Sequence, residues 1–192
     1  AALKHINSGE YNPFEVIKTN VIGTQNVIDA INLNKIPKAI FLSTDKAVSP
    51  INLYGATKLA AEKLFIASNN YSVSSKFSVV KYGNVFNSRG SVFPIFLYQK
   101  KNELLSLTHQ EMTRFNITLD EGVNLVLFSF KDMRGGETYI PKMRSMKIID
   151  LVKIFNPKKG FKEIGIRPGE KLHEELISKS DTSQKIVFKK YF

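Results

Sequence analysis

Two short apolar runs, each preceded by a helical pattern, constrain the fold of this chain more than any other feature. Residues 38–43 read Lys-Ala-Ile-Phe-Leu-Ser, and residues 77–82 read Phe-Ser-Val-Val-Lys-Tyr. Nearly continuous apolar runs of this length are typical of parallel strands that are buried on both faces. The order helix, strand, helix, strand requires crossover connections, so the sequence predicts an α/β fold with a parallel sheet and helices on both faces.

Capping residues and apolar spacing set the expected helices. Asn12, Pro13 and Glu15 predict a helix start with a capping-box-like arrangement, and apolar residues at helical spacing carry that helix to about residue 34. A second helix is expected over residues 53–69. Further helices are expected near residues 93–101, over 120–130, from a cap at Ser145 to residue 155, and over 170–177.

Composition excludes several classes of protein. The chain has 192 residues and 43% hydrophobic content, enough for one buried core, and no apolar run approaches the ~20 residues of a membrane span. It contains no cysteine, which excludes disulfides, Cys-ligated zinc and a thiol nucleophile. His5, His109 and His173 lack the spacing of metal ligands, so no metal site is predicted.

The net charge of +11 comes largely from residues 141–192, which hold 13 basic and 6 acidic side chains. Clustered basic residues attract phosphate groups, including those of nucleic acids. Lysine outnumbers arginine 23 to 5, however, and no nucleic-acid-binding motif accompanies the charge. The charge therefore indicates a solvated surface and does not favour a nucleic-acid partner.

Tyr54 and Lys58 form the first pair of candidate catalytic residues. They stand four residues apart on an expected helix, so both side chains project from one face and can reach one ligand. A phenol has a reference pKa of ~10 and needs a nearby cation to act as a base at neutral pH, a charge that Lys58 can supply. An exposed Tyr and Lys on one helical face is the ordinary alternative.

The loop before that helix reads Ser43-Thr44-Asp45-Lys46 and follows a buried strand directly. Ligands of open α/β sheets bind at the carboxyl ends of strands. Ser43 and Thr44 can hydrogen-bond a substrate hydroxyl, and Asp45 and Lys46 supply an adjacent acid and base. An ordinary polar turn, capped by Thr44 or Asp45, explains the same residues.

Two later segments add further polar groups. Asn84 and Arg89 follow the second strand, among glycines that let backbone amides approach a ligand, and Arg89 can pair with phosphate. Residues 167–171 read Arg-Pro-Gly-Glu-Lys, a rigid turn whose charges suit a diphosphate or a ribose. Turn chemistry alone also explains each segment.

Short motifs in a fixed order span nearly the whole chain. They include Ser43-Thr-Asp-Lys46, Tyr54-Gly-Ala-Thr-Lys58, Tyr82-Gly-Asn-Val85, Met112-Thr-Arg-Phe115 and Arg167-Pro-Gly-Glu-Lys-Leu-His-Glu174. Together they resemble the extended short-chain dehydrogenase/reductase family, in its branch of bacterial polysaccharide-biosynthesis nucleotide-sugar dehydratases and, within it, the inverting UDP-N-acetylglucosamine 4,6-dehydratases. The resemblance implies the C-terminal part of a Rossmann-like, doubly wound parallel sheet over residues 1–100. It also implies a small α/β lobe for the UDP-sugar mainly over 101–192, interleaved with the first part.

The resemblance further implies NADP and a reaction in which C4 is oxidised, water is lost across C5 and C6, and hydride returns to C6 with inversion at C5. Tyr54 would take the 4-hydroxyl proton, while Lys58 would bind the nicotinamide ribose and lower the pKa of Tyr54. Asp45 would protonate the leaving 6-hydroxyl, Lys46 would act at C5, and Thr44 would bind near O4. Such enzymes open pseudaminic acid or capsule sugar synthesis, and the family leads us to expect a cytoplasmic homo-oligomer.

The family's binding positions carry over residue by residue. The implied substrate contacts are Lys4, Asn84, Arg167 and Glu170, and the implied cofactor contacts are Leu42, Ser43, Tyr54, Lys58, Val85, Phe86, Asn87, Ser88 and Arg89. Asn87 departs from the small glycine that is usual in the family at this point. Lys46 replaces the glutamate of many sugar 4,6-dehydratases and matches the inverting subgroup.

One hallmark of the family is missing from the sequence. No glycine triplet fits the G-x-x-G-x-x-G or G-x-G-x-x-G fingerprint that seats a pyrophosphate on a helix N-terminus. We therefore expect roughly three βα units, ~90 residues at about 30 each, to lie upstream in a complete enzyme, whose absence leaves a sheet edge exposed. Two alternatives stay open: a C4 epimerase or retaining dehydratase, which does not need the Asp45–Lys46 pair, and a non-catalytic fragment that binds a partner.

Overall fold

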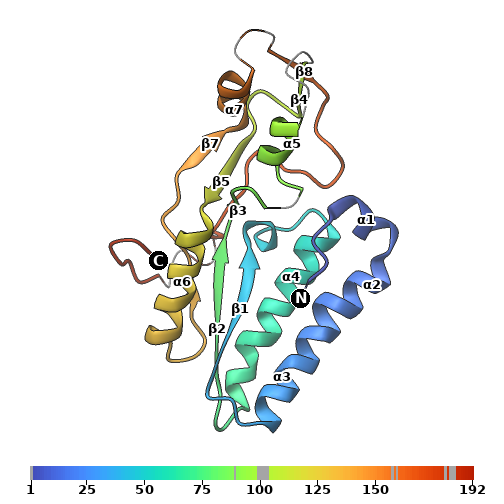
Figure 1. Ribbon diagram of the computed structural model, residues 1–192. Helices are drawn as coiled ribbons and strands as arrows, with labels where there is room; N and C mark the ends of the chain where they lie inside the picture. The colour runs from blue at the N-terminus through green and yellow to red at the C-terminus, as the bar shows by residue number, and fades with distance from the viewer. Residues whose placement is uncertain are drawn as a thin grey trace.

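A parallel three-stranded sheet forms the base of the molecule (Figure 1). The computed structural model describes residues 2–88, 90–98, 104–156, 158, 160–179, 181 and 185–192. Strand β1 (Lys38–Thr44) pairs in parallel with β2 (Lys76–Tyr82) from Lys38↔Lys76 to Thr44↔Tyr82, and β2 pairs in parallel with β6 (Thr138–Tyr139). The two strands expected from the apolar runs and their parallel pairing are confirmed.

Helices cover both faces of this sheet. Helix α4 (Leu53–Ala67) packs on one face with α3 (Gly23–Leu33) beside it, and α6 (Leu119–Asp132) packs on the other face (Figure 1). Phe65 of α4 meets Phe77 of β2 edge to face, with ring centroids 5.0 Å apart, and Ile28 of α3 is buried against them. On the opposite face Leu125 of α6 packs against Val80. The expected two-sided α/β architecture is therefore confirmed.

The N-terminal helix differs from the prediction at its start. Helix α1 (Ile6–Tyr11) already precedes α2 (Pro13–Ile17), and a π-helical turn (Lys18–Ile22) joins α2 to α3. Asn12 makes no side-chain cap, so the expected capping box is wrong: its amide donates instead to the carbonyl of Ser8 at 3.0 Å, while Glu15 pairs with Lys18. The Asn12 side chain is therefore bonded to a backbone carbonyl of α1 and does not cap the start of α2.

A second, smaller lobe stands above the carboxyl end of the base sheet (Figure 1). Strand β3 (Asn84–Val85) pairs in parallel with β5 (Thr113–Ile117), which pairs antiparallel with β7 (Ser145–Lys147), and β4 (Leu105–Leu107) pairs with β8 (Phe161–Glu163). Helices α5 (Val92–Tyr98) and α7 (Ile148–Phe155) complete the lobe around a core that includes Leu107, Met112 and Val152. Since α6 and β6 return to the base sheet, the second half of the chain contributes to both parts.

Two predicted helical features of this lobe are wrong. Ser145 does not cap a helix, because it pairs with Phe115 in the β5–β7 ladder, and α7 begins only at Ile148. Residues 170–177 form an irregular segment with bends and not a helix. The Leu172 carbonyl there accepts hydrogen bonds from the backbone N–H of Thr113 and from Arg114, and these contacts with β5 replace helical hydrogen bonds.

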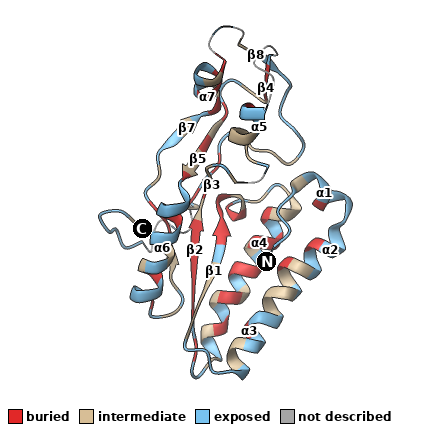
Figure 2. Ribbon diagram, in the orientation of Figure 1, coloured by how far each residue is buried: buried red, intermediate tan, exposed pale blue. Residues whose placement is uncertain are grey.

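The base sheet is open along one side of β1. In the described part of the chain, β1 pairs only with β2, and Figure 2 shows β2 buried along most of its length while β1 is largely intermediate. Leu42 on β1 is 46% exposed, and Phe14, Val27 and Leu33 are exposed on the neighbouring helices. An open strand edge beside exposed apolar side chains is a surface that favours association with further polypeptide.

Candidate functional site

Polar side chains gather where β1 and β2 end. Thr44 and Tyr82 are the last residues of the two strands and stand side by side in the parallel register. A short 3₁₀ turn (Asp45–Ala47) follows β1, and β3 begins two residues after β2. The ammonium of Lys46 donates to Asn84 Oδ1 at 3.0 Å and thereby joins the two strand ends. The site thus lies at the sheet edge where open α/β folds bind ligands.

Helix α4 carries Tyr54 and Lys58 to this edge. The Asn52 side chain caps the helix by accepting from the Gly55 N–H at 2.7 Å. Lys58 is 5% exposed, donates to the Leu42 carbonyl at 2.6 Å and lies 3.8 Å above the centre of the Phe41 ring. Burial lowers the pKa of Lys58 to about 8, an effect that the charge of Glu62 opposes. The helix therefore holds a poorly solvated amine against the end of β1.

Burial is the largest influence on the pKa of Tyr54. Burial raises the pKa of Tyr54 to about 12; a hydrogen bond with Thr44 lowers it, and the charge of Asp45 raises it further. The Lys58 ammonium is directed to the Leu42 carbonyl. The expectation that Lys58 lowers the pKa of Tyr54 stays a prediction.

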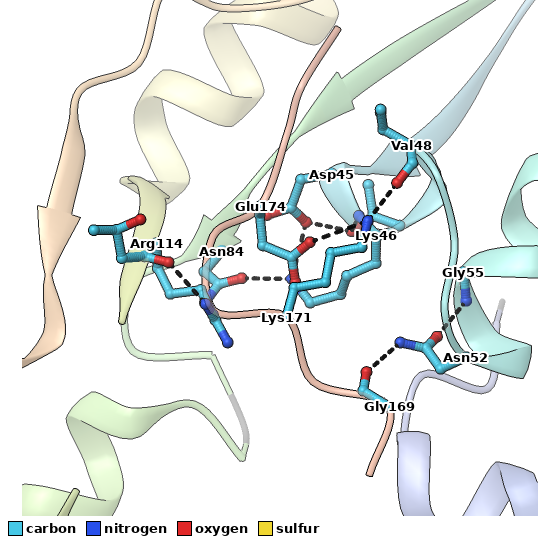
Figure 3. A network of polar contacts seen from close by, with 12 residues as sticks. Asp45, Lys46, Val48, Asn52, Gly55, Asn84, Arg114, Gly169, Lys171 and Glu174 are labelled. Atoms are coloured by element: carbon cyan, nitrogen blue, oxygen red, sulfur yellow. Dashed lines mark hydrogen bonds and ion pairs between the residues drawn. The ribbon is translucent and has the colours of Figure 1, made fainter. Parts of the chain in front are cut away.

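Thr44, Asp45 and Lys46 form one connected cluster, and Figure 3 shows the Asp45–Lys46 contact within it. The Thr44 hydroxyl donates to Asp45 Oδ1 at 2.9 Å, and the Lys46 ammonium lies 2.9 Å from the same oxygen. Thr44 also caps the 3₁₀ turn, so the ordinary turn explanation holds for its backbone role. Asp45 is fully buried, and its Oδ2 has no hydrogen-bond partner among the described residues. Buried carboxylate oxygens without partners are rare and mark sites built for function.

The C-terminal segment adds Glu174, which sequence reasoning missed, beside Lys171 of the predicted 167–171 turn (Figure 3). Glu174 is buried with its Oε1 3.8 Å from the Lys46 ammonium, and Lys171 donates to the Val48 carbonyl at 2.6 Å. Burial raises the pKa of Glu174, an effect opposed by the charges of Lys46, Arg114 and Lys171 and reinforced by Asp45. The motif that ends at Glu174 is present in the sequence, but a helix over residues 170–177 gives no reason to place Glu174 at the site.

The predicted substrate residues lie at different distances from this cluster. Asn84 contacts Lys46 directly. Arg167 and Glu170 face each other at 4.0 Å, and the Gly169 carbonyl between them accepts from Asn52 at 2.7 Å, which fixes the turn beside the start of α4. Lys4 is exposed and precedes α1, next to Leu3, whose backbone is hydrogen-bonded to the buried Asn20 side chain.

The predicted cofactor residues divide between buried and exposed positions. Leu42 is half exposed beside Lys58, whereas the Ser43 hydroxyl donates to Glu62 Oε2 at 2.7 Å and points into the protein. Glu62 also pairs with the buried Lys81 at 3.0 Å, a contact between α4 and β2 that sequence reasoning did not find. Val85, Phe86, Asn87 and Ser88 follow the end of β2 on β3 and the turn after it, and Arg89 lies outside the described residues.

The backbone conformation of Asn87 explains why asparagine can stand where the family usually has glycine. Its φ of 59° lies in the left-handed region that glycine occupies most easily. Asparagine is one of the few other residues that adopt this conformation routinely. The backbone of the turn therefore keeps the shape expected with glycine.

These residues fit the nicotinamide end of a dinucleotide. The Lys58 ammonium gives one N–H to the Leu42 carbonyl, and its other donors suit ribose hydroxyls, as lysine ammoniums carry three donors. The half-exposed Leu42 offers apolar surface for a ring beside it. A glycine-rich loop for the pyrophosphate is absent from the sequence. In the described part of the chain, no three His, Asp or Glu residues are grouped to hold a metal, and no helix is long and apolar enough to cross a membrane.

Gly55 sets how closely α4 approaches the Lys46 turn. A Cβ at position 55 would overlap the Lys46 backbone carbonyl. We expect Gly55→Ala to lower the free energy of unfolding by about 1–3 kcal/mol, because the turn or the helix must shift. Urea denaturation measures the effect. Gly122→Ala in α6 is the matched control: nothing lies within 4 Å of its added methyl, so it should stabilise the helix by about 0.5–1 kcal/mol. Equal effects of the two variants would contradict the close approach.

Comparison with known proteins places this site among related chains. All residues, 1–192, match the family described as "Polysaccharide biosynthesis protein". The chain is 52% identical over its whole length to the UDP-N-acetylglucosamine 4,6-dehydratase (inverting) of Campylobacter jejuni subsp. jejuni serotype O:23/36 (strain 81-176), of which it covers 59%. It is 44% identical over 96% of its length to a UDP-glucose 4-epimerase of Rickettsia bellii, of which it covers 56%.

Solved structures agree with the fold. The crystal structure of Pen from Bacillus thuringiensis superposes with a TM-score of 0.93 at 39% identity, over 100% of this chain and 62% of that one. A Streptomyces venezuelae dTDP-glucose 4,6-dehydratase with NAD bound, 17% identical, shares the fold with a TM-score of 0.80 over 92% of this chain and 62% of its own. The present chain thus spans about three fifths of the length of the proteins it matches.

Proposed function

Since the chain belongs to the polysaccharide biosynthesis protein family and has the Rossmann-like fold of short-chain dehydrogenase/reductase dehydratases and epimerases, we propose that the protein carrying it is an inverting UDP-N-acetylglucosamine 4,6-dehydratase. Its product is UDP-2-acetamido-2,6-dideoxy-L-arabino-hex-4-ulose, an early intermediate of pseudaminic acid or capsule sugar synthesis. The identity of 52% to a relative with this activity supports the substrate and the reaction.

The observation that carries the proposal is the Asp45–Lys46 ion pair beside Tyr54. A dehydratase needs an acid for the leaving 6-hydroxyl and a group that exchanges the C5 proton, in addition to the residues that serve C4. Asp45 and Lys46 are in contact at 2.9 Å, and Asp45 is near enough to Tyr54 to raise its pKa, which supports the proposal that both pairs belong to one site. In the proposed roles, Tyr54 takes the 4-hydroxyl proton, Thr44 binds near O4, Asp45 protonates O6 and Lys46 exchanges the proton at C5.

We propose NADP as the cofactor, held at its nicotinamide ribose by Lys58 and beside Leu42. When bound, it supplies the oxidant for C4 and the reductant for C6. Oxidation at C4 makes the C5 proton acidic, and this acidity allows Lys46 to act there. Solved structures of similar fold that contain NAD support a nicotinamide dinucleotide as the cofactor. That this dinucleotide carries the additional phosphate of NADP is a further step of the proposal.

We also propose that the pyrophosphate is bound by sequence beyond these 192 residues. The lack of a glycine fingerprint, the open edge of β1 and the greater length of the relatives support this reading. The protein expressed from its full reading frame should then retain NADP through gel filtration, and the 192-residue chain alone should not. Retention by the short chain would contradict the proposal.

A C4 epimerase is the second candidate, favoured by the 44% identity to a Rickettsia UDP-glucose 4-epimerase. An epimerase needs the Tyr54–Lys58 pair but has no leaving group for Asp45 to protonate. Incubation of the full-frame protein with UDP-N-acetylglucosamine in deuterated water distinguishes the two by proton NMR. We expect a C6 methyl signal that collapses from a doublet to a singlet as deuterium enters C5, with C5 inverted. An intact C6 with C4 changed would assign the epimerase.

A further inference from the structure

Two buried lysines and one buried carboxylate meet where α4 packs on the ends of β1 and β2 (Figure 1). Glu62 of α4 has its Oε1 3.0 Å from the Lys81 ammonium, and its Oε2 accepts from the Ser43 hydroxyl at 2.7 Å. Ser43 and Lys81 are partners in the parallel register of the two strands. Both oxygens of the Glu62 carboxylate are therefore bonded to the strands beneath the helix.

Lys58, the second buried lysine, stands one helical turn before Glu62. A lysine and a glutamate four residues apart on a helix are neighbours and attract each other. The charge of Glu62 does reach Lys58, since it raises the pKa of Lys58 against the larger, opposite effect of burial. The Lys58 ammonium nevertheless donates to the Leu42 carbonyl at 2.6 Å. The nearest carboxylate on the helix is thus bonded by the other ammonium, that of Lys81.

The Glu62–Lys81 ion pair is not explained by stability alone. The loss of hydration of two buried charges offsets much of their attraction, so a buried ion pair is weak evidence for a contribution to stability. Without Lys81, the Oε1 of Glu62 would lose its partner one turn from the Lys58 ammonium. The ionisable side chains at this end of the helix are Tyr54, Lys58 and Glu62 of α4, Asp45 and Lys46 of the turn after β1, and Lys81 and Tyr82 of β2.

We infer that Lys81 is a positioning residue for Lys58: it holds the Glu62 carboxylate on the strand side of α4, so that the Lys58 ammonium stays on the Leu42 carbonyl. An ammonium captured by Glu62 would be drawn along the helix, away from the end of β1 and from Tyr54. The part of this inference that concerns a cofactor rests on the proposed function, in which Lys58 binds the nicotinamide ribose.

The variant Lys81→Met tests this inference, because it removes the cation and leaves the Glu62 carboxylate open to Lys58. The readout is the pH dependence of Lys58 acetylation by acetic anhydride, followed by mass spectrometry on the full-frame protein without added nucleotide. Burial places the pKa of Lys58 at about 8 in the wild type. A carboxylate that comes into contact favours the charged amine, so we expect the labelling midpoint of Lys58 to rise by about one pH unit. The exposed Lys63 serves as the internal reference and should not change.

Lys76→Met is the matched control, since Lys76 is exposed on the same strand and its loss changes the net charge equally. It should leave the Lys58 midpoint in place, as should Lys81→Arg, which keeps a cation for Glu62. The double variant Glu62→Gln/Lys81→Met should return the midpoint to near the wild-type value, because an amide does not capture the ammonium.

Three results would overturn the inference: an unchanged midpoint in Lys81→Met, an equal rise in Lys76→Met, or a rise that persists in the double variant. If Lys81→Met does not fold, Lys81→Gln takes its place, because its amide can still donate to the Glu62 carboxylate. We expect a smaller rise of the Lys58 midpoint in that variant, and an unchanged midpoint there would equally overturn the inference.

NADP binding separates this inference from the proposed function. We expect Lys81→Met to raise the Kd for NADP about tenfold, the size of one lost hydrogen bond from a charged group, and the double variant to restore it. An unchanged Kd despite a raised midpoint would contradict the part that concerns the cofactor. If the wild-type protein binds no NADP while the Lys58 midpoint shifts and returns as expected, the proposed cofactor fails and the positioning of Lys58 by Lys81 stands. NADP binding with an unchanged midpoint would mean the reverse.

Discussion

Replacing Tyr54 by phenylalanine is expected to lower kcat by about 10²–10⁴-fold, the usual contribution of a positioned acid or base. The change removes one oxygen from a buried ring, so the packing of α4 against the end of β1 is retained. It also removes the group whose pKa the neighbouring Thr44 lowers. Because burial raises the pKa of Tyr54 to about 12, the phenol is protonated at neutral pH in the protein without ligands.

The rate of 6-deoxy product formation by NMR measures this effect in the full-frame protein. Tyr82→Phe is the matched control, because it removes a phenolic oxygen from the adjacent strand end, where burial also raises the pKa. We expect less than about a threefold change in that variant. A Tyr54→Phe protein that keeps more than about a tenth of the wild-type rate would assign the C4 proton to another group.

Strands β1 and β2 of the base sheet were predictable because local and long-range signals agree there. Apolar runs that bury both faces of a strand have few alternatives, and the residues 38–43 and 77–82 became β1 and β2 within one residue at each end. Asn52 caps α4 and so fixes Tyr54 and Lys58 at the sheet edge. The Ser43–Lys46 loop and Asn84 each follow a strand end, and the Lys46–Asn84 hydrogen bond joins them.

The features that were not predictable depend on contacts between distant segments. Ser145 looks like a helix cap, but its pairing with β5 determines its conformation, and no local pattern reveals that partner. Residues 170–177 have helical composition, yet the hydrogen bonds of Leu172 to β5 prevent a helix. Glu174 enters the site only because of this irregular backbone. The same tertiary contact thus explains both the wrong helix and the missed residue.

The pKa values of Tyr54 and Lys58 could not be predicted from the sequence for a related reason. Position i+4 brings Lys58 near Tyr54 on the helix, and the expectation followed that its charge would act on the phenol. The final direction of the ammonium depends on the strand beneath α4, where the Leu42 carbonyl and the Phe41 ring receive it. Spacing along a helix therefore predicts which residues share a face, but burial and strand contacts decide their pKa values.

Replacing Lys46 by arginine should abolish 6-deoxy product formation, with a fall in rate of at least about 10²-fold. Arginine keeps the positive charge beside Asp45, but its guanidinium does not release a proton at accessible pH, so exchange at C5 is lost. The charge is needed for the fold because Asp45 is fully buried. Lys46→Ala would leave that carboxylate unpaired, and we expect it to cost about 3–5 kcal/mol in the free energy of unfolding.

The two Lys46 variants together separate chemistry from stability. Urea denaturation should show Lys46→Arg close to the wild type and Lys46→Ala well below it, while NMR in deuterated water should show no deuterium at C5 with either. Lys63→Arg on the exposed face of α4 controls for the exchange of lysine for arginine and should keep the wild-type rate. Inversion at C4 that persists in Lys46→Arg would favour an epimerase, because that reaction leaves C5 untouched. Full dehydration by Lys46→Arg would instead remove Lys46 from the C5 step and assign that proton to a different group of the cluster.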